Sequence, residues 1–189
     1  MAERLGVFGG TFDPPHVGHL VVAVNVRHAL ELDRVLLVVA NDPWQKRGTR
    51  TVSPARDRLA MVEAAVGDVD GLEASAIEID RGGSSYTADT LAALRAVNPA
   101  TELFLIVGTD AARGLPTWDR VDEVRDLATA VVVTRPDGDD RPDTVEPLPG
   151  WRWVEVQTPR LEVSSTDLRE RVVDGRPLDY LLTPSVIDG

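Results

Sequence analysis

Two histidines, His16 and His19, lie three residues apart and follow a pair of glycines, Gly9 and Gly10. If a helix begins at this point, the spacing places both imidazoles on one helix face. The glycines allow the backbone to approach a ligand closely, and the start of a helix offers unpaired N–H groups and a positive dipole end. Hydrogen-bond donors, partial positive charge and bare backbone in one stretch are typical of a polyphosphate site.

Two other interpretations fit parts of the same stretch. A buried turn with a structural histidine would account for one imidazole, but two at this spacing behind a double glycine favour a ligand site. A metal site would need a third protein ligand, and Asp13 is the only further candidate nearby. The stretch therefore predicts an anion site rather than a metal site.

A second pattern lies near the end of the chain. Ser164 is a good helix N-cap, and Asp167, three residues later, is the matching capping-box residue. The N–H groups of Ser165 and Thr166 would then point out of the start of the helix and form a second anion site, toward which Arg169 in the second turn can reach. Alone, this pattern is also that of an ordinary capped helix.

Further polar and aromatic residues follow predicted strands. A glycine turn leads into a helix at Tyr86 and Thr87. Gly108 and Asp110 come directly after a buried strand, and Trp118 lies on the next connection. Taken alone, Asp110 is a helix-capping residue and Trp118 a half-buried core aromatic.

The elements that must position these residues alternate between strand and helix. Apolar runs without alternation predict buried strands, rough alternation predicts a strand at 72–79, and apolar spacing of three and four predicts helices. We expect strands at 5–8, 35–40, 72–79, 103–107, 130–134 and 151–156, and helices that begin near residues 17 and 54 or cover 87–97, 119–128 and 164–173. This order predicts an α/β fold with a doubly wound parallel sheet, in which ligands bind beyond the carboxyl ends of the strands.

Composition narrows the class of protein. The 189 residues fit a single domain over 1–189, with a formal net charge of −11 and no cysteine. The acidic balance argues against nucleic acid and membrane surfaces as partners, and the lack of cysteine excludes disulfides and thiolate metal sites. No apolar leader and no run near the ~20 residues of a membrane span are present, which predicts a cytoplasmic protein. A homo-oligomer is compatible with the sequence, which does not set the oligomeric state.

Two strings, Thr11-Phe12-Asp13-Pro14 and His16-Val17-Gly18-His19, resemble the signature of the nucleotidyltransferase superfamily. The stretch from Gly9 to His19 is similar to bacterial nicotinate-nucleotide adenylyltransferases in particular. The resemblance extends over nearly the whole chain and implies a Rossmann-like nucleotidyltransferase fold. It implies that ATP and nicotinate mononucleotide are joined to give deamido-NAD (nicotinate adenine dinucleotide) and pyrophosphate in NAD biosynthesis. It also implies Mg²⁺ carried by ATP, with no protein metal site.

The resemblance implies roles for individual residues. Catalysis would use His16, His19, Lys46 and Arg169. ATP would be bound by Gly9, Gly10, Thr11, Phe12, Gly108, Asp110, Ser164, Ser165 and Thr166. The acceptor would be bound by Tyr86, Thr87 and Trp118, with the nicotinate ring stacked on Trp118.

One segment departs from the family pattern. Many members carry a His-Lys pair after a proline-rich stretch, whereas here Gln45 precedes Lys46. Gln45 cannot carry charge, so Lys46 is the remaining candidate for a phosphate contact there.

Two alternative functions stay open at this point. Phosphopantetheine adenylyltransferases have similar phosphate motifs but lack the Gly-Gly-x-x-Tyr-Thr and Trp set. A non-catalytic nucleotide-binding regulatory protein is the alternative from another class, and the intact histidines and basic residues argue against it.

Overall fold

A computed structural model describes residues 2–43, 51–134 and 145–187. Its centre is one six-stranded sheet in the order β3-β2-β1-β4-β5-β6, and every neighbouring pair is parallel. The strands are β1 (Arg4–Gly10), β2 (Arg34–Val39), β3 (Leu72–Ser75), β4 (Glu102–Gly108), β5 (Ala128–Thr134) and β6 (Trp153–Gln157). The strand order reverses between β1 and β4, which confirms the predicted doubly wound sheet.

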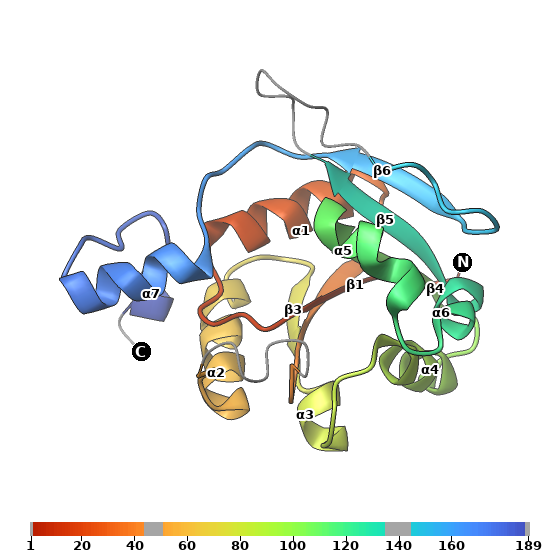
Figure 1. Cartoon of the computed structure of the whole chain (residues 1–189), viewed down its shortest axis with the longest axis horizontal. Helices are drawn as coiled ribbons and strands as arrows, with labels where there is room; N and C mark the ends of the chain where they lie inside the picture. Colours follow the sequence, from red (N-terminus) through yellow and green to blue (C-terminus); the bar gives the residue numbers. More distant parts are fainter. Residues whose placement is uncertain (1, 44–50, 135–144, 188–189) are drawn as a thin grey trace.

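Helices cover both faces of the sheet (Figure 1). One face packs against α1 (Val17–Ala29) and α2 (Ala55–Val66), and the other against α4 (Thr87–Val97), α5 (Thr109–Gly114) and α6 (Val121–Leu127). The remaining elements are α3 (Ile77–Arg81), the short 3-10 helix η2 (Leu115–Thr117), α7 (Ser165–Asp174) and α8 (Pro184–Ile187). Among the described residues, no helix combines the length and apolar character needed to cross a bilayer.

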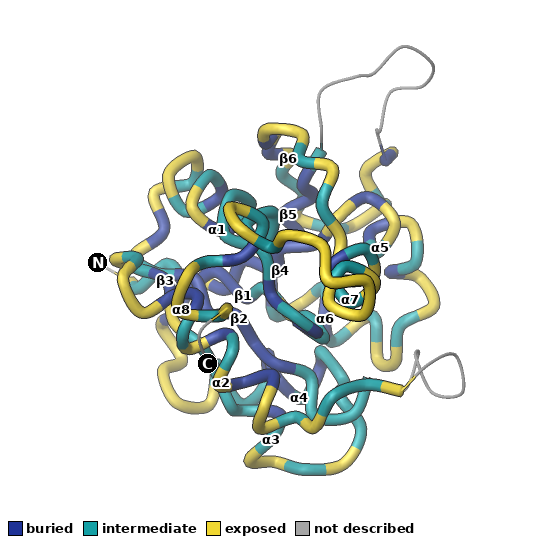
Figure 2. The backbone as a smooth tube through the Cα atoms, turned by 90° about the vertical axis from the view of Figure 1, so that its left-hand side faces the viewer, coloured by how far each residue is buried: buried dark blue, intermediate teal, exposed yellow. Residues whose placement is uncertain are grey.

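The alternation of side chains along β2 shows why this strand is apolar throughout. Val35, Leu37 and Val39 point into the core beneath α1 and α2, whereas Leu36 and Val38 join the core on the opposite face. Each such buried side chain contributes about 1.5–3 kcal/mol to folding. Figure 2 shows the strands as the buried centre of the molecule, enclosed by half-buried and exposed segments.

The third strand is shorter than the sequence pattern predicts. The pattern predicts a strand over 72–79, but β3 ends at Ser75 and α3 begins at Ile77. The strand pairs with β2 only from Leu72 to Ser75, and beyond that point the chain turns so that the Glu78 side chain becomes buried. The strand ends because its hydrogen-bonded pairing with β2 ends at Ser75, although the alternating pattern continues to residue 79.

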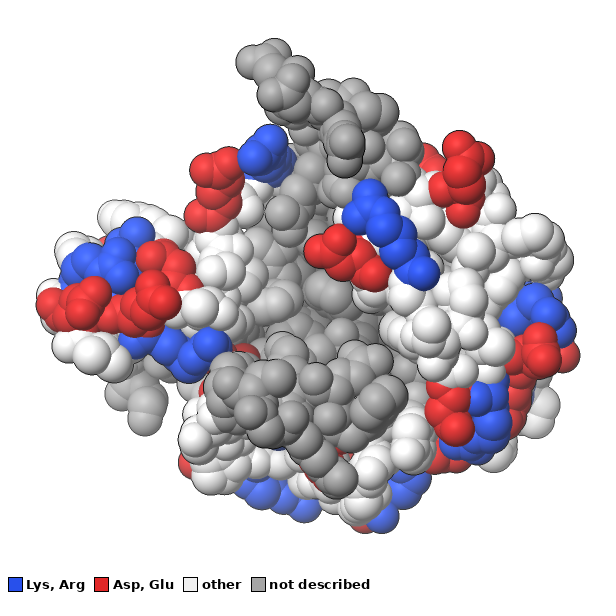
Figure 3. Space-filling model, viewed as in Figure 1, with Lys and Arg blue, Asp and Glu red and all other residues white. Residues whose placement is uncertain are grey.

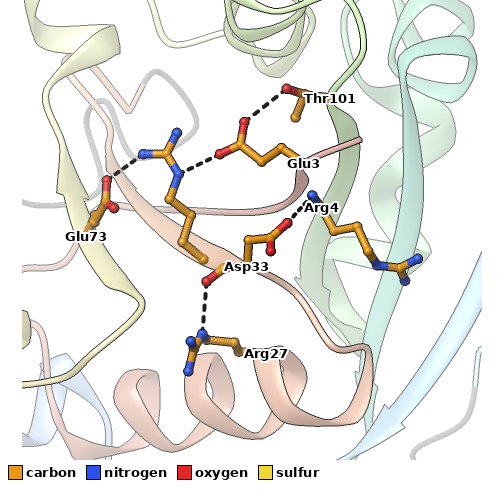
Figure 4. A network of polar contacts seen from close by, with 7 residues as sticks. Glu3, Arg4, Arg27, Asp33, Glu73 and Thr101 are labelled. Carbon is orange, nitrogen blue, oxygen red and sulfur yellow. Dashed lines mark hydrogen bonds and ion pairs between the residues drawn. The ribbon is translucent and has the colours of Figure 1, made fainter. Parts of the chain in front are cut away.

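The amino ends of the strands are joined by a polar network (Figure 4). Arg34 on β2 donates hydrogen bonds to Glu3 at 2.8 Å and to Glu73 on β3 at 2.7 Å. Thr101, before β4, donates to the second oxygen of Glu3 at 3.1 Å. This network lies at the end of the sheet opposite to the carboxyl ends of its strands.

Candidate functional site

Two adjoining cavities lie at the carboxyl ends of β1 and β4, where the strand order reverses. Their volumes are about 380 Å³ and about 370 Å³, and Phe8 and Gly108 line both. We name the larger one the tryptophan cavity, because Trp118 lines it, and the other the histidine cavity, because His16 and His19 line it. The structure therefore places most of the predicted site residues around two adjoining spaces rather than one.

The two imidazoles of the histidine cavity are stacked on each other. Their ring centroids are 3.7 Å apart with an interplanar angle of 27°. The backbone N–H of His16 donates to Nδ1 of His19 at 3.1 Å, and the N–H of His19 donates to the carbonyl of His16 at 2.9 Å. Because Nδ1 of His19 accepts a hydrogen bond, the neutral ring carries its proton on Nε2.

Neighbouring side chains hold the histidine pair in place. The ring of Phe12 meets the ring of His19 edge-on, with centroids 5.0 Å apart. A Cβ on Gly18 would lie 3.0 Å from Nδ1 of His16 and 3.0 Å from a methyl group of Val163. Only glycine therefore fits at position 18 without displacing the His16 ring.

The start of α7 is tied to the loop that precedes α1. The Ser165 hydroxyl donates to the carbonyl of Pro14 at 2.8 Å, and the guanidinium of Arg169 donates to the carbonyl of Asp13 at 2.6 Å. Ser164 and Ser165 line the same cavity as the histidines. The starts of two helices, α1 and α7, thus meet at one cavity although 151 positions separate Pro14 from Ser165.

The capping of α7 differs in part from the predicted capping box. Ser164 is the N-cap and its hydroxyl accepts from the N–H of Asp167 at 3.2 Å. The Asp167 carboxylate, however, accepts from Arg171 at 2.6 Å and from Arg176 at 3.4 Å instead of returning to the N-cap. The hydrogen bond from Arg171 lowers the pKa of Asp167 below its usual value, and the charges of Arg171 and Arg176 act in the same direction.

The tryptophan cavity combines an apolar wall with the start of α4. Tyr86 is the N-cap of α4 and Thr87 its first residue, and both line the cavity together with Trp118. Gly9, Gly10 and Thr11, which the family resemblance assigns to ATP, line this cavity and not the histidine cavity. No Lys, Arg or His occurs among the described residues that line this cavity, so its anion donors are backbone N–H groups and hydroxyls.

Three predicted site residues, Phe12, Thr166 and Arg169, line neither cavity. Phe12 is buried and supports His19, and the Arg169 guanidinium is held by Asp13 and, at 3.2 Å, by the hydroxyl of Thr166.

Asp110 lines the histidine cavity, where its fully exposed carboxylate pairs with Arg113 at 3.0 Å. Lys46 lies outside the described residues.

The structure adds residues that the sequence patterns did not reveal. Glu78 is only 7% exposed, lines the tryptophan cavity and accepts a 2.7 Å hydrogen bond from the hydroxyl of Thr90, which also lines it. A charged residue inside the strand predicted over 72–79 was the available signal for Glu78. Arg58 is 1% exposed, and its position in an apolar helix face was the corresponding signal.

The surface of the molecule on the side shown in Figure 3 carries charges of both signs. Basic and acidic side chains are interspersed, and α7 carries a cluster of both. The attraction of the site for anions therefore comes from oriented N–H groups at helix starts rather than from a broad basic surface.

Comparisons with known proteins point to one family. A family model described as cytidylyltransferase-like matches residues 7–171. The chain is 44% identical to a probable nicotinate-nucleotide adenylyltransferase of Corynebacterium kroppenstedtii, over 97% of this chain and 86% of the relative. It is 46% identical to a protein of the same name from Streptomyces coelicolor, over 95% and 93% of the two chains.

A solved structure shows the same fold at low identity. It is nicotinic acid mononucleotide adenylyltransferase of Plasmodium falciparum complexed with NaAD, with a TM-score of 0.77 and 16% identity over 98% of this chain and 93% of that chain. The chain belongs to the nicotinate-nucleotide adenylyltransferases of the cytidylyltransferase-like family.

Proposed function

We propose that this protein transfers the adenylyl group of ATP to nicotinate mononucleotide, giving deamido-NAD and pyrophosphate. The observation that carries the proposal is the pair of adjoining cavities that share Phe8 and Gly108, with the stacked histidines in one of them. A dinucleotide product needs two nucleotide-sized spaces that meet at a phosphate. The relatives' names and the NaAD in the Plasmodium structure support the same choice of substrates.

The chemistry of each cavity supports one of the two substrates. The histidine cavity has the starts of α1 and α7 and the two imidazoles, which together suit the triphosphate of ATP. The tryptophan cavity offers an indole for a cationic pyridinium ring, worth about 0.5–2 kcal/mol, and the N–H groups at the start of α4 for the nicotinate carboxylate. ATP therefore binds on the histidine side and nicotinate mononucleotide on the tryptophan side.

The acceptor phosphate is the nucleophile. With a second pKa of about 6, it is largely a dianion at neutral pH, so no general base is needed. One of its oxygens forms a bond to the α-phosphorus of ATP while the bond from that phosphorus to the bridging oxygen breaks and pyrophosphate leaves. Catalysis then rests on positioning and on stabilising charge at the α-phosphate, where His16 and His19 act as donors.

The start of α7 holds the leaving pyrophosphate. Ser164 and Ser165 contribute the N–H groups at this point, the Ser164 hydroxyl is a further donor, and Thr166 follows them in the first turn. Arg169 fixes α7 to the loop at Asp13 and thereby orients these donors. Lys46 remains the candidate that brings the two anionic substrates together.

Magnesium enters as a component of the ATP substrate. Asp110 is the one carboxylate among the described residues that line the histidine cavity, and it is paired with Arg113. This donor set fits a Mg²⁺ ion held by phosphate oxygens and water rather than by a protein cage. The ion would neutralise charge on the departing pyrophosphate.

A pyrophosphate-release assay tests the proposal. The protein is incubated with ATP and Mg²⁺ and with nicotinate mononucleotide, nicotinamide mononucleotide or phosphopantetheine. Release with the first acceptor, together with deamido-NAD as product, is expected. Release with phosphopantetheine alone would establish the alternative transferase, and nucleotide binding without release from any acceptor would indicate the regulatory protein.

A further inference from the structure

A buried arginine on α2 binds the backbone behind the tryptophan cavity. Arg58 is 1% exposed, and its guanidinium donates hydrogen bonds to four carbonyl oxygens. Nη1 reaches Thr11 at 2.7 Å, and Nη2 reaches Ala40 at 2.7 Å and Asn41 at 3.3 Å. Nε reaches Ser53 at 2.9 Å.

These carbonyls belong to segments that come from different parts of the fold. Thr11 follows β1, and Ala40 follows β2, and both line the tryptophan cavity. The N–H of Ala40 also donates to the carbonyl of Gly10 at 2.9 Å. One guanidinium therefore fixes the distance between two neighbouring strand ends that form one wall of the cavity.

A further segment of the cavity lining is connected to Arg58 through Asn41. The N–H of Asn41 donates to the hydroxyl of Ser85 at 2.9 Å, and its side-chain amide donates to the carbonyl of Gly83 at 2.8 Å. Ser85 lines the cavity and lies just before the start of α4. A continuous chain of hydrogen bonds thus runs from Arg58 to the segment that leads into α4.

Burying a guanidinium costs free energy that an apolar side chain of similar size would not. A planar fork with five donors can bind carbonyls on separate segments at once, whereas the single ammonium nitrogen of lysine cannot span them. We propose that Arg58 is a positioning residue that sets the geometry of the acceptor subsite, the tryptophan cavity. The proposal rests on the proposed function in taking nicotinate mononucleotide as the acceptor.

The first test compares Arg58→Lys and Arg58→Met with the whole wild-type protein in steady-state kinetics. Because a misplaced subsite would lose acceptor contacts comparable with one hydrogen bond from a charged group, we expect the KM for nicotinate mononucleotide to rise by ~10-fold to ~100-fold. The KM for ATP should stay near the wild-type value, since the histidine cavity does not contain the Arg58 contacts. Arg58→Lys should recover part of what Arg58→Met loses.

Arg34→Met is the matched control for lost stability. It also removes an arginine that joins segments, through Glu3 and Glu73, but at the opposite end of the sheet (Figure 4). We expect it to lower Tm and to leave both KM values unchanged. An unchanged acceptor KM in a folded Arg58→Met, equal rises in both KM values, or failure of both Arg58 variants to fold would overturn the positioning role.

Amide hydrogen exchange tests the inference without turnover. In Arg58→Lys, the amides of Ala40, Asn41 and Ser85 should exchange faster, whereas those of Val131 and Val132 in β5 should not change. Unchanged exchange at the first three would contradict the proposal. If the wild-type protein itself released no pyrophosphate with nicotinate mononucleotide, the proposed function would fail while this measurement still decided the role of Arg58.

Discussion

The backbone N–H of His16 donates a hydrogen bond of 3.1 Å to Nδ1 of His19, so that one histidine fixes the ring of the next. This bond leaves Nε2–H as the donor of His19 on a residue that lines the histidine cavity. The stacking of the two rings at 3.7 Å makes the pair a single unit. A donor that is already oriented loses little entropy when charge develops on the α-phosphate.

His19→Ala should therefore lower turnover strongly. We expect a loss of ~10²-fold to ~10⁴-fold in kcat, the range for removing one preorganised donor to the transition state, with the fold intact. Pyrophosphate release measures the rate, and circular dichroism measures the fold. His28→Ala is the matched control, because His28 lies exposed at the end of the same helix. Turnover of His19→Ala near that of His28→Ala would remove His19 from catalysis.

Trp118→Ala should weaken binding of the acceptor. Loss of a cation–π contact of about 0.5–2 kcal/mol predicts a rise of ~2-fold to ~30-fold in the KM for nicotinate mononucleotide. Trp118→Phe should lie between the wild type and Trp118→Ala, and the KM for ATP should not change. An unaltered acceptor KM in Trp118→Ala would place the ring elsewhere.

Gly108→Ala should reduce activity without loss of stability. A Cβ at this position meets no atom within 4 Å, and the residue lines both cavities, so the methyl group would occupy space meant for substrates. The contrasting variant is Gly10→Ala, whose Cβ would lie 2.7 Å from the Phe12 ring. That variant should lose about 1–3 kcal/mol of unfolding free energy. Thermal unfolding measures the stability of both variants, and pyrophosphate release measures the activity of Gly108→Ala. A lower Tm for Gly108→Ala than for Gly10→Ala would contradict the prediction.

Arg169→Ala should raise the KM for ATP more than that for the acceptor. The variant removes the hydrogen bond to the carbonyl of Asp13 that ties α7 to the loop before α1. A hydrogen bond from a charged group is worth about 1.5–3 kcal/mol, so a rise of at least ~10-fold is expected. Arg171→Ala, also on α7, should leave the KM for ATP unchanged. Equal effects of the two variants would assign Arg169 a general role in helix stability only.

The carboxyl group of Asp167 should titrate below its usual pKa. Its folded-state pKa is lowered by the hydrogen bond from Arg171, so its contribution to stability is present above the pKa of the unfolded chain. That contribution is lost as pH falls through the folded-state pKa. NMR titration should show this low pKa in the wild type and a higher one in Arg171→Ala. The same pKa in both proteins would assign the shift to another cause.

Much of the fold follows from local patterns. Apolar runs predict β2 and β4, because a strand buried on both faces has no need of polar positions. The serine before α7 and the glycine–histidine stretch before α1 mark helix starts, since capping and the backbone freedom of glycine act over a few residues. These local signals suffice to locate the candidate anion donors along the chain.

Contacts between distant segments required the tertiary structure. The tie between Ser165 and Pro14, the burial of Glu78 against Thr90 and the four carbonyls around Arg58 all join segments that are separate in the sequence. Several of these partners are backbone carbonyls, which every residue possesses, so no residue type marks them. The length of β3 was likewise decided by its ladder with β2. The sequence determined which groups could bind phosphates, and packing of the sheet and helices decided which of them share a cavity.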